Sequence, residues 1–541
     1  MKKRNASLTG LSSLTFPPVF FEDEVREGFF VSGMMKRCWA AQLKALSEVN
    51  RICEKHDIVW WICTGTLLGA VRHKGFIPWD DDLDICMMRE DLEHFLQLAP
   101  GELTEGYSLG DVRTRDDYEN PNLRVITTEI IHPDIMRRFY GFPYTAGVDI
   151  FALDGIFPEE VREQQKREEF AELVQIFSKI KTTPQEKQLI EEDLRRIEEK
   201  HRITFNRRGN LCNQLMRVLI KVLQQCPVAE AKEIEMYLEP KDDFRLRKEW
   251  FSDTVKLPFE HLMLPACSGY AEMLRTVYKN VSFQKMGGAY HDYPYYQKFE
   301  DDQKKAIGHH VLRYTFTEDE FREMCACRKR TITNQRSEDV GKQREIVFLP
   351  ARKEWWNTMA PVYELALSEP DAKVIVLPVS WHRKDMDGNP YDEHNEAEEL
   401  SGLVTVTSGE EYDITACRPA VIVTQFPYDE TNRDVEIDER YFSKNLVNYA
   451  EKVIYVPCYD VETPEKGDEI SRKALSVLIE QPAVVYADLV LLPTKGLREI
   501  YIETLTDIAG EETRAVWEKK IQTTDTPDLN VLRSLFRTET E

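Results

Sequence analysis

The chain has 541 residues, and 95 Asp and Glu against 71 Lys and Arg give it a formal net charge of −24. Its length predicts two domains, or one large and one small. So acidic a chain suits neither nucleic acid nor an anionic membrane surface, because both attract Lys and Arg through their phosphates. With 42% hydrophobic residues, 24 Gly and 26 Pro, it is neither collagen-like nor of low complexity, which indicates a folded protein.

Residues 1–18 begin with basic residues but hold only scattered apolar ones, so they lack a signal-peptide core. The uncharged run Ile58 to Val71 is shorter than the roughly 17 to 25 residues that span a bilayer. We therefore expect no transmembrane segment and a cytoplasmic protein, which could also lie at the inner face of the membrane. The cysteines are dispersed, as free thiols are, and the close pair Cys325 and Cys327 lacks the further ligands of a zinc site.

The first half of the chain alternates helical and strand patterns. Residues 33–56 have the spacing of an amphipathic helix, and residues 58–71 predict a strand, a Thr-Gly-Thr turn and a short helix. Residues 159–200 are rich in both charges and broken by Pro184, which predicts two exposed helices. Residues 210–225 carry one apolar stripe that should dock on the first domain. We interpret residues 158–245 as a helical insertion.

The second half has a different pattern. Residues 328–344 are polar and without periodicity, which predicts a linker between domains 1–327 and 345–541. Beyond it, short apolar runs rich in β-branched residues alternate with helical patterns such as residues 354–368. Such runs predict buried parallel strands in a Rossmann-like, three-layer lobe. The runs are residues 345–350, 373–379, 420–426 and 452–457. The predicted fold class is therefore α/β.

Acidic residues follow the predicted short helix. Asp82 and Asp84 alternate with Leu83 and Ile85, so both carboxylates project from one face of an extended segment. Two carboxylates on one face are costly unless a cation lies between them. Mg²⁺ characteristically takes one or two carboxylates together with substrate phosphates. We predict a divalent cation site, for Mg²⁺ or Mn²⁺, rather than an acidic turn that merely hydrates a strand end.

Phosphate-binding candidates lie just upstream of these acids. Gly65 and Thr66 stand at a strand-to-helix junction, where Gly allows close approach and the helix N-terminus offers free N–H groups to an anion. Arg72, His73 and Lys74 supply positive charge before the acids. Arg72 is the better candidate for a bidentate phosphate contact, ahead of Lys74.

A third acid could complete the metal site or accept a proton. Residues 147–157 hold Asp149 between apolar residues of a predicted strand, and Asp154 in a Leu-Asp-Gly turn. We select Asp149, because an Asp before Gly more often forms a turn, although Asp154 could also lie near the site.

These residues together resemble a known family. The run from Gly65 to Ile85 is similar to the signature of the LicD family, which also contains fukutin-related proteins and has a nucleotidyltransferase superfold. Residues 34–46, 147–155, 257–265 and 289–296 are also like that family, so the resemblance covers roughly the first 300 residues. One departure is Tyr278-Lys279-Asn280, where the family often has Tyr-Gly-Asp.

The resemblance implies a nucleotidyltransferase-like catalytic domain built on a mixed sheet, and a transfer reaction. It makes Asp82, Asp84 and Asp149 the metal ligands and Gly65 and Thr66 the phosphate turn. LicD-like enzymes move a phospho-alcohol, phosphocholine or a polyol phosphate, from a CDP-linked donor to a sugar hydroxyl of a cell-surface glycan or teichoic acid, releasing CMP. His291 could contact the donor phosphate or the sugar, although a lone His is more often structural.

A second resemblance concerns residues 345–504, which look like the N-terminal half of CDP-glycerol glycerophosphotransferases, two-lobed GT-B enzymes. The nucleotide of such enzymes lies mainly on the C-terminal lobe, and residues 345–541 have no Gly-rich fingerprint. We therefore expect a non-catalytic lobe that binds the acceptor, a partner or the first domain.

Two alternative functions stay open. One is nucleotidyl transfer, in which the acceptor attacks the α-phosphate and keeps the nucleotide. The other is a scaffold of glycan assembly without catalysis. The expected partners are a CDP-alcohol donor and a glycan or polyol-phosphate acceptor, with no nucleic acid, and peripheral association with envelope assembly enzymes is a further option.

Overall fold

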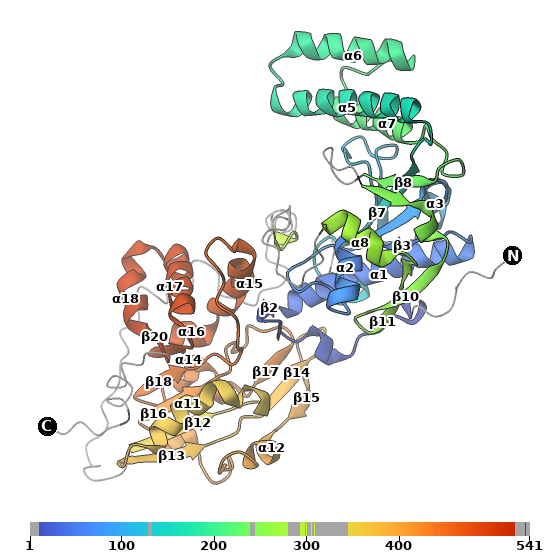
Figure 1. Ribbon diagram of the computed structural model, residues 1–541. Helices are drawn as coiled ribbons and strands as arrows, with labels where there is room; N and C mark the ends of the chain where they lie inside the picture. The colour runs from blue at the N-terminus through green and yellow to red at the C-terminus, as the bar shows by residue number, and fades with distance from the viewer. Residues whose placement is uncertain are drawn as a thin grey trace. The chain divides into compact units, whose positions relative to one another are not determined.

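The computed structural model describes residues 10–127, 133–237, 244–279, 293–297 and 344–524, together with Phe299, Lys305, Gly308 and Phe536 (Figure 1). The predicted α/β class is confirmed. The chain forms two compact units, residues 1–16 with 37–286 and residues 17–36 with 287–541. Residues 17–36 thus pack with the second unit, whereas the sequence placed them in the first domain. Apart from Arg344, the linker predicted at 328–344 lies outside the described residues and stays a prediction.

A mixed sheet organises the first unit, with strand order β3-β4-β7-β6-β5 and with β8 and β9 continuing from β7. β4 and β7 are parallel, and the other neighbours run antiparallel. β10 and β11 form a separate hairpin. The strands are β3 (Trp61–Ile62), β4 (Asp84–Met88), β5 (Tyr107–Gly110), β6 (Leu123–Thr127), β7 (Gly147–Gly155), β8 (Glu233–Met236), β9 (Arg245–Arg247), β10 (Thr254–Phe259) and β11 (Leu262–Cys267).

The predicted amphipathic helix at 33–56 is confirmed as α1, whose apolar stripe, including Trp39 and Leu43, is fully buried. The predicted strand, turn and short helix at 58–71 appear as β3 followed by α2. No helix of the described residues is long and apolar enough to cross a membrane. The helices outside the insertion are α1 (Gly33–Lys55), α2 (Thr64–Arg72), α3 (Arg89–Glu102), α4 (Pro133–Met136) and α8 (Tyr270–Tyr278).

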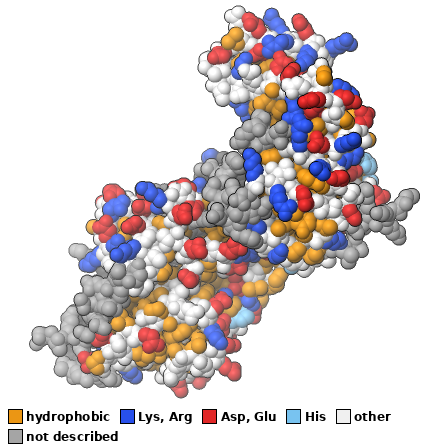
Figure 2. Space-filling model, in the orientation of Figure 1, with side chains coloured by type: hydrophobic (Ala, Val, Ile, Leu, Met, Phe, Trp, Pro, Cys, Tyr) orange, Lys and Arg blue, Asp and Glu red, His pale blue; other side chains and the backbone are white. Residues whose placement is uncertain are grey.

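The insertion contains the two predicted helices around Pro184, α5 (Glu160–Thr182) and α6 (Lys187–His201), and α7 (Leu211–Leu223). Figure 2 shows acidic and basic side chains interspersed on α5 and α6. Asn213 of α7 donates to the backbone carbonyls of Val112 and Tyr118 at 3.0 and 2.7 Å, so the helix contacts the rest of the first unit. Its apolar stripe, which was expected to dock there, packs mainly against α5 and α6 of the insertion itself. The segment is not purely helical, since it continues into β8, which pairs with β7 and extends the sheet.

A fully parallel six-stranded sheet organises the second unit, in the order β13-β12-β16-β18-β19-β20. Successive residues of its strands enter two different hydrophobic clusters, so both faces are buried as predicted. A smaller antiparallel sheet has the order β15-β14-β17. The strands are β12 (Arg344–Leu349), β13 (Ala372–Val376), β14 (Trp381–Lys384), β15 (Pro390–His394), β16 (Val421–Thr424), β17 (Val435–Ile437), β18 (Lys452–Tyr455), β19 (Leu489–Leu492) and β20 (Ile521–Thr523).

Helices lie between these strands, and the one predicted at 354–368 is α11 (Trp356–Leu367). The others are α12 (Ala397–Ser401), α13 (Ile414–Cys417), α14 (Ser443–Leu446), α15 (Glu469–Ile479), α16 (Pro482–Tyr486), α17 (Lys495–Ala509) and α18 (Arg514–Lys520).

The N-terminal segment 17–36 carries a two-stranded ribbon, β1 (Glu24–Arg26) and β2 (Phe29–Val31). Buried Glu22 pairs with Arg352 at 2.8 Å and with Arg383 at 2.7 Å. These ion pairs explain why the segment packs with the second unit, and they join residues too far apart in sequence for any local pattern to reveal.

Candidate active site

The acid site is formed by two neighbouring parallel strands. Asp84 is the first residue of β4, and its register partner on β7 is Asp149. Directly paired residues of adjacent strands project from the same face of a sheet, so the two carboxylates lie side by side. Asp82 belongs to the extended segment that enters β4, two residues before Asp84 and hence on the same face. The structure therefore brings Asp82, Asp84 and Asp149 together.

Asp84 is almost completely buried, with 6% of its surface exposed. The Thr64 hydroxyl donates to its carboxylate, and its backbone N–H donates to Thr66 Oγ1 at 2.8 Å. Burial, and then the carboxylates of Asp82 and Asp149, raise the pKa of Asp84 well above its usual value, against the opposing effect of Thr64. This carboxylate is thus held in a place where its negative charge is poorly compensated.

The start of α2 lies directly beside the acids. Thr64 has φ +46°, an unusual backbone conformation for a β-branched residue and one that costs of order 1–3 kcal/mol. A Cβ on Gly65 would come within 2.7 Å of Asp80 Oδ2, so a larger residue there would require the Asp80 carboxylate to move. Cys63, at the N-cap, gives α2 no side-chain hydrogen bond. The first N–H groups of this helix therefore stay available close to the carboxylates.

Asp149 has a different environment from Asp84. Arg124 donates to both of its carboxylate oxygens, from Nη2 to Oδ2 at 2.5 Å and from Nε to Oδ1. Asn122 Nδ2 donates to Oδ1 at 3.0 Å. Arg124 comes from β6, where it is the register partner of Asp149. Asp149 is thus oriented and charge-compensated by the chain itself.

Asp82 and Asp84 have the chemistry of a divalent cation site. Their clustered oxygens, one buried with a raised pKa, suit Mg²⁺, which takes one or two carboxylates and fills its shell with water or phosphate. Within the described residues, no group of three or more His, Cys, Asp or Glu side chains is positioned to hold a metal ion. That finding agrees with the engagement of Asp149 by Arg124. The donor set fits two carboxylates as ligands, with Asp149 adjacent.

The basic residues predicted to bind phosphate lie at the other end of α2. Arg72 is the last residue of that helix, about 10 Å along its axis from Gly65 at 1.5 Å per residue. Lys74 is exposed, and its ammonium donates to the Val71 carbonyl at 2.9 Å. The structure thus brings Gly65 and Thr66 to the acids, but not the backbone of Arg72 and Lys74. His291, like Cys325 and Cys327, lies outside the described residues.

Asp154 has a structural contact instead. It is fully buried in β7, and Arg89 donates to both of its oxygens at 2.7 Å. Five positions separate it from Asp149 on the same strand, so its side chain projects from the opposite face of the sheet. The preference for Asp149 over Asp154 agrees with this geometry, and the expected turn role of Asp154 is replaced by a buried ion pair.

Some neighbours of the acids were not selected from the sequence. Arg124 and Asn122 were missed because the register between β6 and β7 cannot be read from the chain. Tyr278, at the end of α8, is near the acids: burial, and then Asp84, Asp80 and Asp82, raise the pKa of its phenol. Its only sequence signal was the departure from the family pattern at residues 278–280.

Comparison with known proteins supports the first resemblance. Residues 57–173 match the family described as LicD/FKTN/FKRP, nucleotidyltransferase domain. An uncharacterized protein of Rickettsia typhi is 39% identical over 114 residues, which are 19% of this chain and 37% of that protein. The lipopolysaccharide cholinephosphotransferase LicD of Haemophilus influenzae is 42% identical over 67 residues, 12% of this chain and 25% of that protein.

A human relative, the ribitol 5-phosphate transferase FKRP, is 39% identical over 64 residues, 11% of this chain and 13% of that protein. The chain thus spans well under half the length of each of these relatives. The LicD-like resemblance is confirmed for residues 57–173, which contain Gly65, Thr66 and the three acids. The likeness of residues 345–504 to CDP-glycerol glycerophosphotransferases stays a prediction.

Proposed function

We propose that the protein is a Mg²⁺-dependent transferase that moves a phospho-alcohol from a CDP-linked donor to a sugar hydroxyl of a cell-surface glycan or teichoic acid precursor. The observation that carries the proposal is the pairing of Asp84 with Asp149 beside the start of α2, within the segment that matches the LicD/FKTN/FKRP family. Two relatives named as transferases of cholinephosphate and of ribitol 5-phosphate support a phospho-alcohol as the transferred group.

Asp82 and Asp84 would hold Mg²⁺, or Mn²⁺ in its place, with Asp149 as a third carboxylate. When bound, the metal would supply positive charge for the pyrophosphate and for the departing CMP. Thr64 and Thr66 fix Asp84, through the side chain and the backbone respectively. This prior positioning matters because phosphoryl transfer is accelerated mainly by alignment and charge compensation.

The proposed transfer forms one phosphorus–oxygen bond and breaks another. The acceptor hydroxyl oxygen attacks the phosphorus that carries the alcohol, and the bond from that phosphorus to the CMP oxygen breaks, so CMP leaves with the electron pair. The hydroxyl proton passes to a carboxylate. We assign Asp149 as the acceptor of that proton, since Arg124 and Asn122 hold its carboxylate in a fixed orientation beside Asp84. If it is a metal ligand instead, water takes the proton.

The start of α2 would receive a donor phosphate. Gly65 lets the backbone approach a ligand closely, and the first N–H groups of a helix favour an anion. Arg72, Lys74 and His291 are proposed contacts of more distant phosphate or sugar groups.

The alternative of nucleotidyl transfer uses the same acids, and only the attacked phosphorus differs. A scaffold without catalysis would not need acids packed this closely. We propose that the second unit is a non-catalytic lobe that positions the acceptor. We also propose a cytoplasmic location for the whole protein, with peripheral association with envelope assembly enzymes as an option.

The test is to incubate the full chain with Mg²⁺ and a panel of CDP-alcohols and sugar acceptors, and to separate the products. Phospho-alcohol transfer gives CMP and a phosphorylated acceptor. Nucleotidyl transfer from a nucleoside triphosphate gives pyrophosphate and a nucleotidylated acceptor. Absence of both product pairs for every donor and acceptor tried would favour the scaffold and overturn the proposal.

A further inference from the structure

A cavity of about 930 Å³ opens in the first unit, away from the acids. It lies at the end of β4 opposite to Asp84, where Met88 lines it. Asp84 and Met88 are the first and last residues of β4, about 13 Å apart at 3.3 Å per residue. The volume falls in the range of about 300–1,000 Å³ that small-molecule sites occupy.

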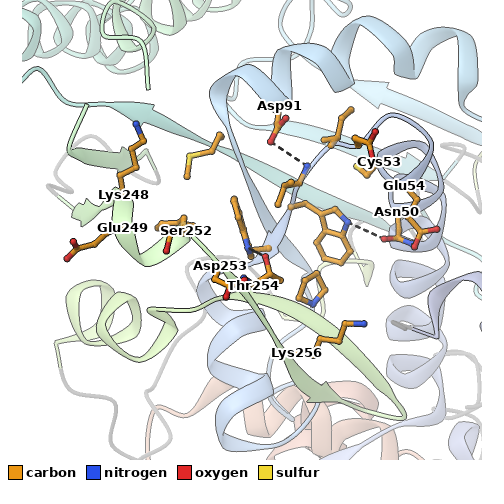
Figure 3. A pocket seen from close by; sticks show the side chains of 18 of the residues that line it. Asn50, Cys53, Glu54, Asp91, Lys248, Glu249, Ser252, Asp253, Thr254 and Lys256 are labelled. Carbon is orange, nitrogen blue, oxygen red and sulfur yellow. Dashed lines mark hydrogen bonds between the residues drawn. The ribbon is translucent and has the colours of Figure 1, made fainter. Parts of the chain in front are cut away.

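Aromatic and apolar side chains form one part of the cavity wall. Trp61 and Phe251 meet edge to face with ring centroids 5.2 Å apart, and the Trp61 indole N–H donates to Thr254 Oγ1 at 2.9 Å. Figure 3 shows Asn50, Cys53 and Glu54 of α1 on one side of the cavity, and Lys248 and Glu249 on the other. Such a mixture of ring surfaces and polar groups suits a ligand with a ring and hydroxyl groups.

The carboxylates of the cavity are exposed or hydrogen-bonded. Asn50 donates to Glu54 at 2.9 Å, and the Val59 backbone N–H donates to Asp91 at 3.4 Å. The remaining lining acids are exposed at the rim: Asp57, Glu249 and Asp253. None of them therefore needs a cationic ligand.

Lys256 is the exception among the charged lining residues. Its Nζ is shielded from solvent and makes no hydrogen bond to any residue within the described ranges. Lys248, in contrast, donates to the Val228 carbonyl at 2.6 Å, and Lys232 is exposed. An ammonium with neither water nor an acceptor is costly, and its flexible stem allows it to meet an anion in the cavity.

Position on the hairpin directs Lys256 toward the cavity. It stands two residues after Thr254 on β10, so both project from the same face. Its cross-strand partner is Pro265, which also lines the cavity. The countercharge and the ring surfaces thus line one cavity.

We propose that this cavity is a second ligand site, separate from the acids, which binds a small phosphate ester of a sugar or nucleoside. Lys256 is the countercharge of the phosphate, and Trp61 and Phe251 contact the ring. The proposal does not depend on the transfer reaction, because no residue of the acid site takes part in it.

The test uses calorimetric titration of the full chain carrying Asp84→Asn, without added divalent cation, so that metal-dependent binding at the acids is removed; any binding at the start of α2 is the same in all variants compared. The probes are ribose 5-phosphate, CMP and, for comparison, ribose without phosphate. We expect the phosphate esters to bind at least tenfold more tightly than ribose. Adding Lys256→Met should weaken their binding about tenfold or more, the loss of one charged hydrogen bond. Lys256→Arg should retain it within about threefold.

Lys232→Met is the matched control, because it removes an exposed lysine from the same rim and should change affinity less than about threefold. Equal affinities for Lys256→Met and Lys232→Met, or no binding of either phosphate ester, would overturn the proposal. Failure here leaves the transfer proposal untouched, since that is measured with intact Asp84.

Thermal melting provides a second measurement that needs no ligand. Removing an unpaired, shielded ammonium should raise the melting midpoint of the first unit by about 2–4 °C in Lys256→Met. A lower midpoint would mean that Lys256 already has a stabilising partner, and it would contradict the assigned role.

Discussion

In the first unit Asp84 is buried beside two further carboxylates, whereas in the second unit Glu22 is buried between the guanidinium groups of Arg352 and Arg383. Asp84 is the first residue of β4, and Glu22 pairs with Arg383 of β14. Burial, and then the neighbouring like charges, raise the pKa of Asp84, whereas the charge of Glu22 is matched by two arginines. Buried like charges are costly unless a cation lies between them or one group holds a proton, whereas a matched pair is complete without a ligand.

The contrast bears on which unit carries chemistry. In the parallel sheet of the second unit the order of strand addition reverses between β12 and β16, since β13 lies on one side of β12 and β16 on the other. Doubly wound folds bind ligands at the carboxyl ends of the strands at such a switch point. Arg352 follows β12 there, and its guanidinium lies 3.8 Å from the Trp381 ring. Glu22 engages this arginine from the chain's own N-terminal segment. Arg352 and Arg383 therefore have a buried countercharge within the chain, which supports a structural role for this pair of arginines.

The largest expected effect comes from Asp84→Asn. It removes a proposed metal ligand, so CMP release should fall about a thousandfold, a loss of about 4 kcal/mol of transition-state stabilisation. The fold should persist or gain stability, because a buried and poorly compensated charge is removed. Initial rates and thermal melting with and without Mg²⁺ measure both, and only the wild-type protein should be stabilised by the ion.

Asp117→Asn is the matched control for that change, since Asp117 is exposed and pairs with Arg115 at 2.7 Å. It should leave rates and melting unchanged. Full activity of Asp84→Asn, or an equal response of Asp82→Asn and wild type to Mg²⁺, would disprove the metal site and remove the contrast between the two units.

Glu22→Gln should have the next largest effect, on stability alone. It leaves Arg352 and Arg383 without their buried countercharge, which costs about 3–5 kcal/mol in comparable sites. Urea unfolding should show the second unit destabilised, with CMP release nearly unchanged. Glu27→Gln, an exposed change in the same segment, should cost less than about 0.5 kcal/mol. A parallel loss of CMP release in native Glu22→Gln protein would place part of the donor site in the second unit.

Asp149→Asn should lower transfer about a hundredfold, less than Asp84→Asn. Arg124 already compensates Asp149, so part of the Mg²⁺-dependent rise in melting temperature should survive if Asp149 accepts the proton. Asp154→Asn is the informative comparison: it breaks the buried pair with Arg89 and should destabilise the fold while preserving the Mg²⁺ response. Normal turnover in Asp149→Asn would exclude it as the third carboxylate.

The sequence predicted those parts of the molecule that depend on local pattern. The helix at 33–56, the strands near 346, 375, 422 and 454, and the strand-to-helix junction at Gly65 follow from periodicity and turn chemistry, and all are confirmed. Clustering of Asp82 and Asp84 also follows from strand alternation. Local pattern could not supply the register between neighbouring strands. That register pairs Asp149 of β7 with Asp84 of β4 on one side and with Arg124 of β6 on the other.

Long-range pairing explains the other differences. Residues 17–36 pack with the second unit through Glu22, whose partners are more than 300 positions away in the chain. Arg72 stands before the acids in sequence, but a helix carries it about 10 Å away from Gly65. Proximity along the chain is thus a poor guide to charge pairing wherever a helix or a crossover intervenes.

The smallest expected effect concerns Glu480, an acid of the second unit whose pKa is raised to about 7 by burial alone. A raised pKa means that folding favours the protonated form. The resulting stability is fully present below the usual pKa of about 4.5 and is lost as the pH rises through 7.

Glu480→Gln should therefore be more stable than wild type by about 1–3 kcal/mol at pH 8 and nearly equal at pH 4.5. Urea unfolding at both values measures this, with the exposed Glu410→Gln as the control. A loss of stability at pH 8 would show that Glu480 has a compensating partner, as Glu22 does, and would contradict the prediction.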